Sequence, residues 1–187
     1  RFGTLDPTDG GNANRFSLSG RWEQSDKDSA TRANAYVINS SLNLYNNFTY
    51  FLNDQTNGDQ FRQSDRRTIL GGQASHTFKG DVGGRPIETE VGFQTRQDRI
   101  SVGLEDTVAR QTWNVVRSDF VRQTSGAVYV ENRYKLTEWF RTSLGLRGDT
   151  YLVDVNSNIA ANSGKATDSI VSPKFGMVFG PWAKTEL

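Results

Sequence analysis

The sequence of 187 residues contains no cysteine, one methionine, one histidine and four prolines. Without a thiol the chain forms no disulfide, no thiolate metal site and no cysteine nucleophile. The single histidine, His76, excludes a catalytic centre or a metal site built on several histidines of this chain. We therefore interpret His76 as a structural residue.

Long apolar runs are also missing. Only 35% of the residues are hydrophobic and the mean hydropathy is −0.63. No stretch approaches the roughly 20 consecutive apolar residues that a membrane helix requires, which excludes a helical membrane protein. A transmembrane β-barrel remains possible, because its water-facing residues alternate with its lipid-facing residues and lower the average hydropathy.

Neither sign of charge dominates. The chain has 22 Lys and Arg against 21 Asp and Glu, a formal net charge of +1. This balance gives no basic field toward phosphate backbones, so nucleic acid is not an expected partner. No segment has the charged start, apolar middle and small-residue cleavage site of a signal peptide. Since the first residue is Arg1, we expect a piece of a mature protein with both ends cut.

Short alternating segments make up most of the sequence. Connections rich in Asn, Asp, Gly and Ser separate stretches in which apolar and polar residues alternate, a pattern typical of antiparallel strands. No helix is predicted. The predicted strands cover residues 15–24, 33–50, 62–79, 86–104, 113–134, 139–155 and 169–180, and an eighth begins near residue 184.

Within each predicted strand, one parity is apolar and the other polar, as expected where one face meets lipid and the other meets water. In the second strand the parity containing Tyr36, Ile38 and Leu42 is predicted to face lipid. The charged residues predicted to face the lumen and a plug domain are Glu88, Glu90, Arg96, Glu131, Arg133, Arg141 and Arg147.

The predicted connections alternate between short and long, which indicates short periplasmic turns and longer outer loops. The short ones are residues 25–32, 80–85, 135–138 and 180–184, and the longer ones are 1–14, 51–61, 105–112 and 156–168. Trp and Tyr favour a lipid–water interface. The predicted periplasmic aromatic girdle comprises Trp22, Tyr36, Tyr134, Trp139 and Trp182.

Two segments resemble the barrel of TonB-dependent outer-membrane receptors. Residues 2–11, FGTLDPTDGG, lead into Arg15-Phe16-Ser17, like an Asp- and Gly-rich outer loop that enters a barrel strand of that family. Near the other end, Ser172-Pro173-Lys174 followed by residues 175–182 is similar to a strand and turn of the same family. Weaker similarity lies at residues 60–63, 66–67, 71–72 and 145–149.

The resemblance implies an all-β fold: an antiparallel transmembrane β-barrel wall of about seven complete meander strands plus the start of an eighth. Since barrels of this family have about 22 strands, residues 1–187 would be a partial barrel domain, without a plug domain, TonB box or signal peptide. It further implies the bacterial outer membrane, uptake of an iron–siderophore complex or similar scarce nutrient, and no cofactor or resident metal. The implied partners are outer-membrane lipid, the plug domain and remaining strands of the parent protein, TonB, and the transported small molecule.

A candidate ligand-binding rim lies where the second predicted strand meets the third, because arginine forks bind carboxylates and catecholate-like anions. Its residues are Tyr45, Tyr50, Arg62, Arg66 and Arg67. The oxygen-rich segment with Asp6, Asp9, Asn12 and Asn14 matches no EF-hand spacing, so a solvated turn is preferred there over a calcium site.

An enzyme is not predicted, because no nucleophile, base and acid occur together as a recognisable set. Two alternatives to a receptor wall remain open at this point. One is a complete small outer-membrane barrel that serves as an anchor or adhesin. The other is a soluble β-barrel that binds a small ligand. Against it, the predicted strands are longer than the strands of globular proteins, which usually have about 5–6 residues.

Overall fold

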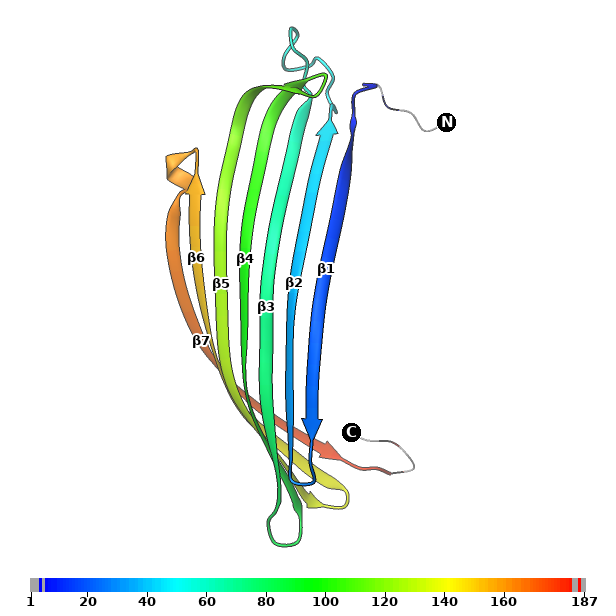
Figure 1. Ribbon diagram of the computed structural model, residues 1–187, viewed down its shortest axis with the longest axis vertical. Coiled ribbons are helices and arrows are strands. Elements are labelled where there is room, and N and C mark those ends of the chain that lie inside the picture. Colours follow the sequence, from blue (N-terminus) through cyan, green and yellow to red (C-terminus); the bar gives the residue numbers. More distant parts are fainter. Residues whose placement is uncertain (1–3, 5, 183–184, 186–187) are drawn as a thin grey trace.

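A computed structural model describes residues 4, 6–182 and 185, and shows one antiparallel sheet whose strand order follows the chain order. Its strands are β1 (Gly10–Ser25), β2 (Ser29–Asn46), β3 (Phe61–Asp81), β4 (Pro86–Val108), β5 (Gln111–Thr137), β6 (Phe140–Ser157) and β7 (Gly164–Phe179). A single helical turn, η1 (Ala160–Asn162), precedes β7. Within these residues, no helix is long and apolar enough to cross a membrane. The predicted all-β meander is confirmed (Figure 1).

Six of the seven strands are longer than predicted, and the strands range from 16 residues in β1 to 27 in β5. The exception is β2, which has the predicted length of 18 residues but begins and ends four residues earlier than predicted. A tilted strand needs only about 9–11 residues to cross a bilayer, so each of these strands is longer than such a crossing requires. The long loop predicted at residues 105–112 is wrong. Ala109 and Arg110 alone join β4 to β5, with φ angles of 47° and 67°, the left-handed conformation of a two-residue hairpin turn.

The remaining connections divide between the two ends of the sheet. Short turns at residues 26–28, 82–85 and 138–139 lie at the lower end in Figure 1, and the segments 47–60 and 158–163 lie at the upper end. The predicted eighth strand falls largely outside the described residues. Trp182 and Thr185 form an isolated antiparallel bridge there.

The register defines the two faces of the sheet, because directly paired residues point to the same side. One row runs through Trp22, Ala33, Ala74, Phe93, Val128 and Val171, and the opposite face carries Arg21, Asn34, Gln73, Gln94, Ala127 and Asp149. Side chains spread apart on the convex side of a curved sheet and crowd together on the concave side. Val128 is 66% exposed and Ala127 is 8% exposed, so we call the first side the outer face and the second the inner face.

The outer face carries a continuous apolar belt near the lower half of the strands. Its members include Phe16, Leu18, Trp22, Leu70, Phe78, Val91, Phe93, Val128, Val130, Leu144, Leu146 and Phe175, all of them exposed. Among the described residues only Ala30, Ile69 and Ala127 are buried hydrophobics. The sheet therefore has no packed core of its own, and an apolar surface of this extent requires a covering partner such as lipid.

The register corrects the predicted facing of β2. Tyr36 pairs with Gly71, which pairs with Arg96 on the inner face, whereas the adjacent Val37 pairs with Leu70 in the apolar belt. The prediction failed because β2 has apolar residues at both parities, so alternation alone does not choose a face. Tyr36 consequently does not belong to a lipid-facing girdle.

Candidate functional site

The inner face holds a charged network. By the register, the seven charged residues predicted to project inward share this face: Glu88, Glu90, Arg96, Glu131, Arg133, Arg141 and Arg147. Arg133 is the centre of the network, since its guanidinium lies 3.3 Å from Glu88, 3.3 Å from Glu90 and 2.9 Å from Glu131. Lys174 of β7 approaches Glu131 to 2.8 Å. Ion pairs thereby connect β4, β5 and β7.

Inner-face charges also pair along single strands. Arg96 lies 2.9 Å from Asp98, Arg147 lies 2.8 Å from Asp149, and Arg67 lies 2.9 Å from Asp65. Residues two apart on a strand point to the same side, so one strand can supply both members of a pair. Sequence reasoning identified the arginines at 96 and 147, and placed Asp149 on the same polar parity as Arg147, but did not pair either arginine with its acid. Opposite charges at a spacing of two would have revealed them.

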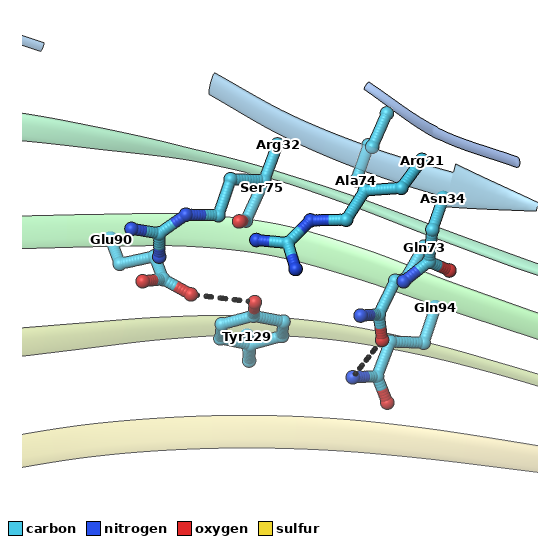
Figure 2. A pocket seen from close by; sticks show the side chains of 10 residues that line it. Arg21, Arg32, Asn34, Gln73, Ala74, Ser75, Glu90, Gln94 and Tyr129 are labelled. Carbon is cyan, nitrogen blue, oxygen red and sulfur yellow. Dashed lines mark hydrogen bonds between the residues drawn. The ribbon is translucent and has the colours of Figure 1, made fainter. Parts of the chain in front are cut away.

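A polar hollow of about 300 Å³ lies within this face (Figure 2). The Tyr129 hydroxyl donates a hydrogen bond to Glu90 at 2.8 Å, and the Gln94 amide donates to Gln73 at 3.2 Å. Arg21 and Arg32 extend into the same hollow. The hollow thus presents hydrogen-bonding groups on fixed strands, an arrangement suited to binding a polar partner.

The predicted ligand-binding rim is divided between the two faces. Tyr45, Arg62 and Arg66 belong to the outer face, whereas Arg67 belongs to the inner face. Tyr50 lies in the 47–60 segment with a φ of 63°. Sequence proximity suggested one cluster, but consecutive residues of a strand alternate sides. Ligand contact by these residues stays a prediction.

Arg62 is already engaged on the outer face. Its guanidinium donates to Asn43 Oδ1 at 2.6 Å and lies 3.2 Å from Glu105. It also lies 6.0 Å from the centre of the Tyr45 ring, which Arg110 approaches to 5.3 Å. The contacts link the upper ends of β2, β3 and β4 to the turn after β4.

Gln60 fastens three upper connections together. Its Oε1 accepts hydrogen bonds from Thr107 Oγ1 at 3.0 Å and from the Arg110 amide at 2.9 Å. Its Nε2 donates to Thr8 Oγ1 at 2.7 Å. The side chain is almost fully buried. We call this contact the Gln60 clasp.

The oxygen-rich segment before β1 uses its oxygens for internal hydrogen bonds. Hydrogen bonds from the side chains of Thr8 and Asn47 lower the pKa of Asp6 below its ordinary value. In the described part of the chain, no group of three or more His, Cys, Asp or Glu side chains has the arrangement of a metal site. The preferred interpretation of this segment is a hydrogen-bonded turn.

Aromatic side chains gather at the lower end. Trp139 stacks at 6.3 Å from both Phe179 and Trp182, and Phe179 stacks at 4.7 Å from Phe140. Trp22 and Tyr134 lie on the outer face toward the same end. Nearby, His76 on the outer face is 2.7 Å from the Thr31 hydroxyl, which gives this single histidine a structural hydrogen bond.

Residues 1–184 match the sequence profile of the family described as TonB dependent receptor-like, beta-barrel. No curated protein matches the sequence.

Solved structures share the fold. The ferric citrate transporter FecA in the unliganded form has a TM-score of 0.74 at 12% identity, over 95% of this chain and 26% of its own. The copper transporter OprC has a TM-score of 0.70 at 14% identity, over 92% and 29%. The open form of the ferric-catecholate import receptor Fiu from E. coli K12 has 0.63 at 12%, over 92% and 33%. At these identities the likeness shows the fold alone, and the chain spans about a quarter to a third of the length of these structures.

Proposed function

The chain belongs to the family of TonB-dependent receptor-like β-barrels, and from this membership we propose that it forms part of the wall of a bacterial outer-membrane receptor. In this proposal the parent protein takes up an iron–siderophore complex or a similar scarce nutrient, and TonB in the periplasm supplies the energy for transport. The structural neighbours include proteins named for ferric citrate, ferric catecholate and copper. The two alternatives, a complete small barrel and a soluble barrel, are not favoured by the family match.

The observation that carries the proposal is the opposite character of the two faces. The outer face exposes the apolar belt, while the inner face gathers Arg133, Glu88, Glu90 and Glu131 into one ion-pair network. Transmembrane barrels have this arrangement, with an apolar band toward lipid and a polar interior. It supports an assignment to the outer membrane.

The inner-face network is our proposed contact for a plug domain supplied by the rest of the parent protein. The hollow beside Tyr129 exposes hydrogen-bonding groups, and the Arg133 side chain is 48% exposed despite its three acidic neighbours. Partly exposed ion pairs are worth little to the strand pairing itself. They remain able to bind a polar protein surface that enters the lumen.

Uptake by cells tests the proposed function. Cells that lack the full-length parent gene, with or without a plasmid copy, would be supplied with ⁵⁵Fe as ferric citrate and as a ferric catecholate, and in parallel with a copper salt. We expect accumulation of one of these probes to depend on the plasmid copy and to disappear in a strain that lacks TonB. Accumulation that is indifferent to the gene, or independent of TonB, would contradict the proposal.

A matched pair of variants tests the plug contact. Arg133→Gln removes the central cation from the inner face, whereas Arg122→Gln removes a cation from the outer face of the same strand. In the full-length receptor, we expect Arg133→Gln to increase the rate at which a thiol reagent labels a cysteine placed on the plug surface. The outer-face variant should label at the wild-type rate, and equal rates in all three proteins would argue against the contact.

A further inference from the structure

Three arginines form a row on the outer face, above the apolar belt. Arg99 and Arg122 are directly paired across β4 and β5, and Arg66 of β3 is paired with Ser101, two residues beyond Arg99. All three are exposed. We call them the outer arginine row. Since like charges placed opposite each other destabilise a sheet, a row of this kind calls for a compensating anion.

The chain itself supplies little compensation to this row. No ion pair joins Arg66, Arg99 or Arg122 to any residue that the structure describes. One acid, Asp154, is paired directly with Arg122 in the register, but its carboxylate lies 3.4 Å from Lys165 and makes no ion pair with Arg122. No acid is paired with Arg66 or Arg99, and Glu105 of β4 lies 3.2 Å from Arg62. On the inner face, by contrast, the arginines 67, 96, 133 and 147 each contact an acid.

Each arginine of the row is separated by the same number of residues, counted along its own strand, from an apolar or aromatic residue at the lower border of the belt. Arg66 lies twelve residues before Phe78, Arg99 twelve after Ile87, and Arg122 twelve before Tyr134, which pairs with Ile87. Those apolar and aromatic residues mark the lower border of the belt. A tilted strand crosses the hydrocarbon in about 9–11 residues. The row therefore takes the first outer-face positions beyond the hydrocarbon, at the level of lipid headgroups.

A groove accompanies the row. It has a volume of about 430 Å³, and its lining includes Asn39, Ser41, Thr68 and Ser101 together with Arg66 and Arg99. The Thr68 hydroxyl donates to Asn39 Oδ1 at 3.2 Å, which fixes the Asn39 amide with its own N–H groups still able to donate. Guanidinium, amide and hydroxyl donors around one groove are the groups that hold phosphate oxygens.

We propose that this groove binds the phosphate group of a lipid in the outward-facing leaflet. The lipid chains lie against the apolar belt, in contact with Leu70 and Phe93. The phosphate neutralises the opposed guanidinium groups, and its oxygens accept hydrogen bonds from the groove. The proposal rests on the outer-membrane placement proposed above. It adds a lipid site on the outer face to a protein whose transport chemistry takes place on the inner face.

Native mass spectrometry of the full-length protein in detergent tests this site. The probes are phosphatidic acid, diacylglycerol with the same chains, and inorganic phosphate. The test variant is Arg66→Gln with Arg99→Gln. The control, Arg15→Gln with Arg96→Gln, removes two cations from the inner face, neither of which lines the groove.

We expect the outer variant to lower phosphatidic acid occupancy by about tenfold, as loss of two charge-assisted contacts implies, and the inner control to bind like the wild type. Diacylglycerol should bind the three proteins equally, and millimolar inorganic phosphate should not displace the lipid. Equal loss in both variants, no preference for phosphatidic acid, or displacement by inorganic phosphate would overturn the proposal. Because binding is measured without transport, a failed uptake experiment and a failed lipid site remain distinguishable.

Discussion

The ring of Tyr129 lies over the bare Cα of Gly92 on the inner face: a methyl group at Gly92 would approach Cζ of Tyr129 to 2.5 Å. Tyr36 covers Gly71 in the same way on the neighbouring pair of strands. Each glycine therefore gives a large ring room to lie flat against the sheet. The Tyr129 hydroxyl uses this position to reach Glu90.

Gly92→Val should destabilise the full-length barrel by about 1–3 kcal/mol, because the new side chain overlaps the Tyr129 ring. Gly126→Val is the matched control, since no atom lies within 4 Å of a Cβ at that position. Thermal unfolding in detergent, followed by the heat-dependent gel mobility of the folded barrel, measures the difference. Equal losses in the two variants would contradict the assigned contact.

The fold was largely predictable where the two parities of a strand differ in polarity. In β4, Glu88 and Glu90 alternate with Val91 and Phe93, and the register places these two pairs on opposite faces. The predictions failed where polarity does not alternate. Val37 and Ile38 gave no preference for a face. Residues 105–112 resembled a loop because polar residues occupy both parities there, as in Glu105 and Asp106.

The candidate site was predictable only in part, because contacts between strands depend on register. The inward parity of Arg133 follows from its own strand, but its meeting with Glu88 and Lys174 requires the pairing of β4, β5 and β7. The same limit explains why Arg66 and Arg67 were grouped as one ligand rim although they lie on opposite faces.

The assignment of the two faces of the sheet leads to a second prediction, on the adjacent residues Ser17 and Leu18. Leu18→Arg places a charge within the apolar belt of β1 and should cost about 2–4 kcal/mol in the full-length protein. Ser17→Arg adds the same charge to the inner face and should be tolerated. Chemical unfolding in lipid vesicles compares the two, and a larger loss for the Ser17 variant would reverse the assignment of the faces.

Topology makes a third prediction, aided by the absence of cysteine in this chain. On intact cells, a membrane-impermeant thiol reagent should label cysteines placed at Thr56 and Ala161, which lie in the upper connections. It should not label cysteines at Asp28 and Arg85 in the lower turns. Labelling of the lower pair alone would show that the sheet has the opposite orientation in the membrane. Labelling of all four cysteines would show that the lower turns are not shielded from the cell exterior.

The 47–60 segment should respond to acid through Asp59. Hydrogen bonds, chiefly from the Thr49 side chain and then from the Asn53 amide, lower the pKa of Asp59 from 3.8 to about 2. A lowered pKa means that the carboxylate stabilises the segment fully above pH 4, roughly, and that this contribution disappears as the pH falls toward 2.

Carboxyl-carbon NMR of the full-length protein measures this pKa directly. Thr49→Val removes the leading donor, so the pKa of Asp59 should move back toward 3.8. Thr56→Val is the control, since Thr56 contacts Asp54 only through its backbone amide. An unchanged pKa in the Thr49 variant would show that another interaction holds the carboxylate.

The Gln60 clasp makes the final prediction. Gln60→Leu removes the acceptor for the Arg110 amide and the donor to Thr8, so the β4–β5 turn should open more often. Trypsin added to intact cells should then cleave after Arg110 faster than in the wild type. Gln63→Leu, an exposed change on the inner face of β3, three residues after Gln60, is the control. Equal cleavage in both variants would show that the clasp does not restrain the turn.

The pairing of charges two residues apart has a consequence for how such barrels change over evolutionary time. Because Arg96 with Asp98 and Arg147 with Asp149 each lie on one strand, a strand that moves carries its own counter-charge with it. A hairpin could then be duplicated or exchanged between related barrels without leaving an isolated inward charge. In the Arg133 network the same spacing pairs Arg133 with Glu131 on β5, but Glu88 and Glu90 of β4 and Lys174 of β7 depend on β5 for their ion pairs. Recombination should therefore spare the hairpins around Arg133 and cut beside the self-neutral strands.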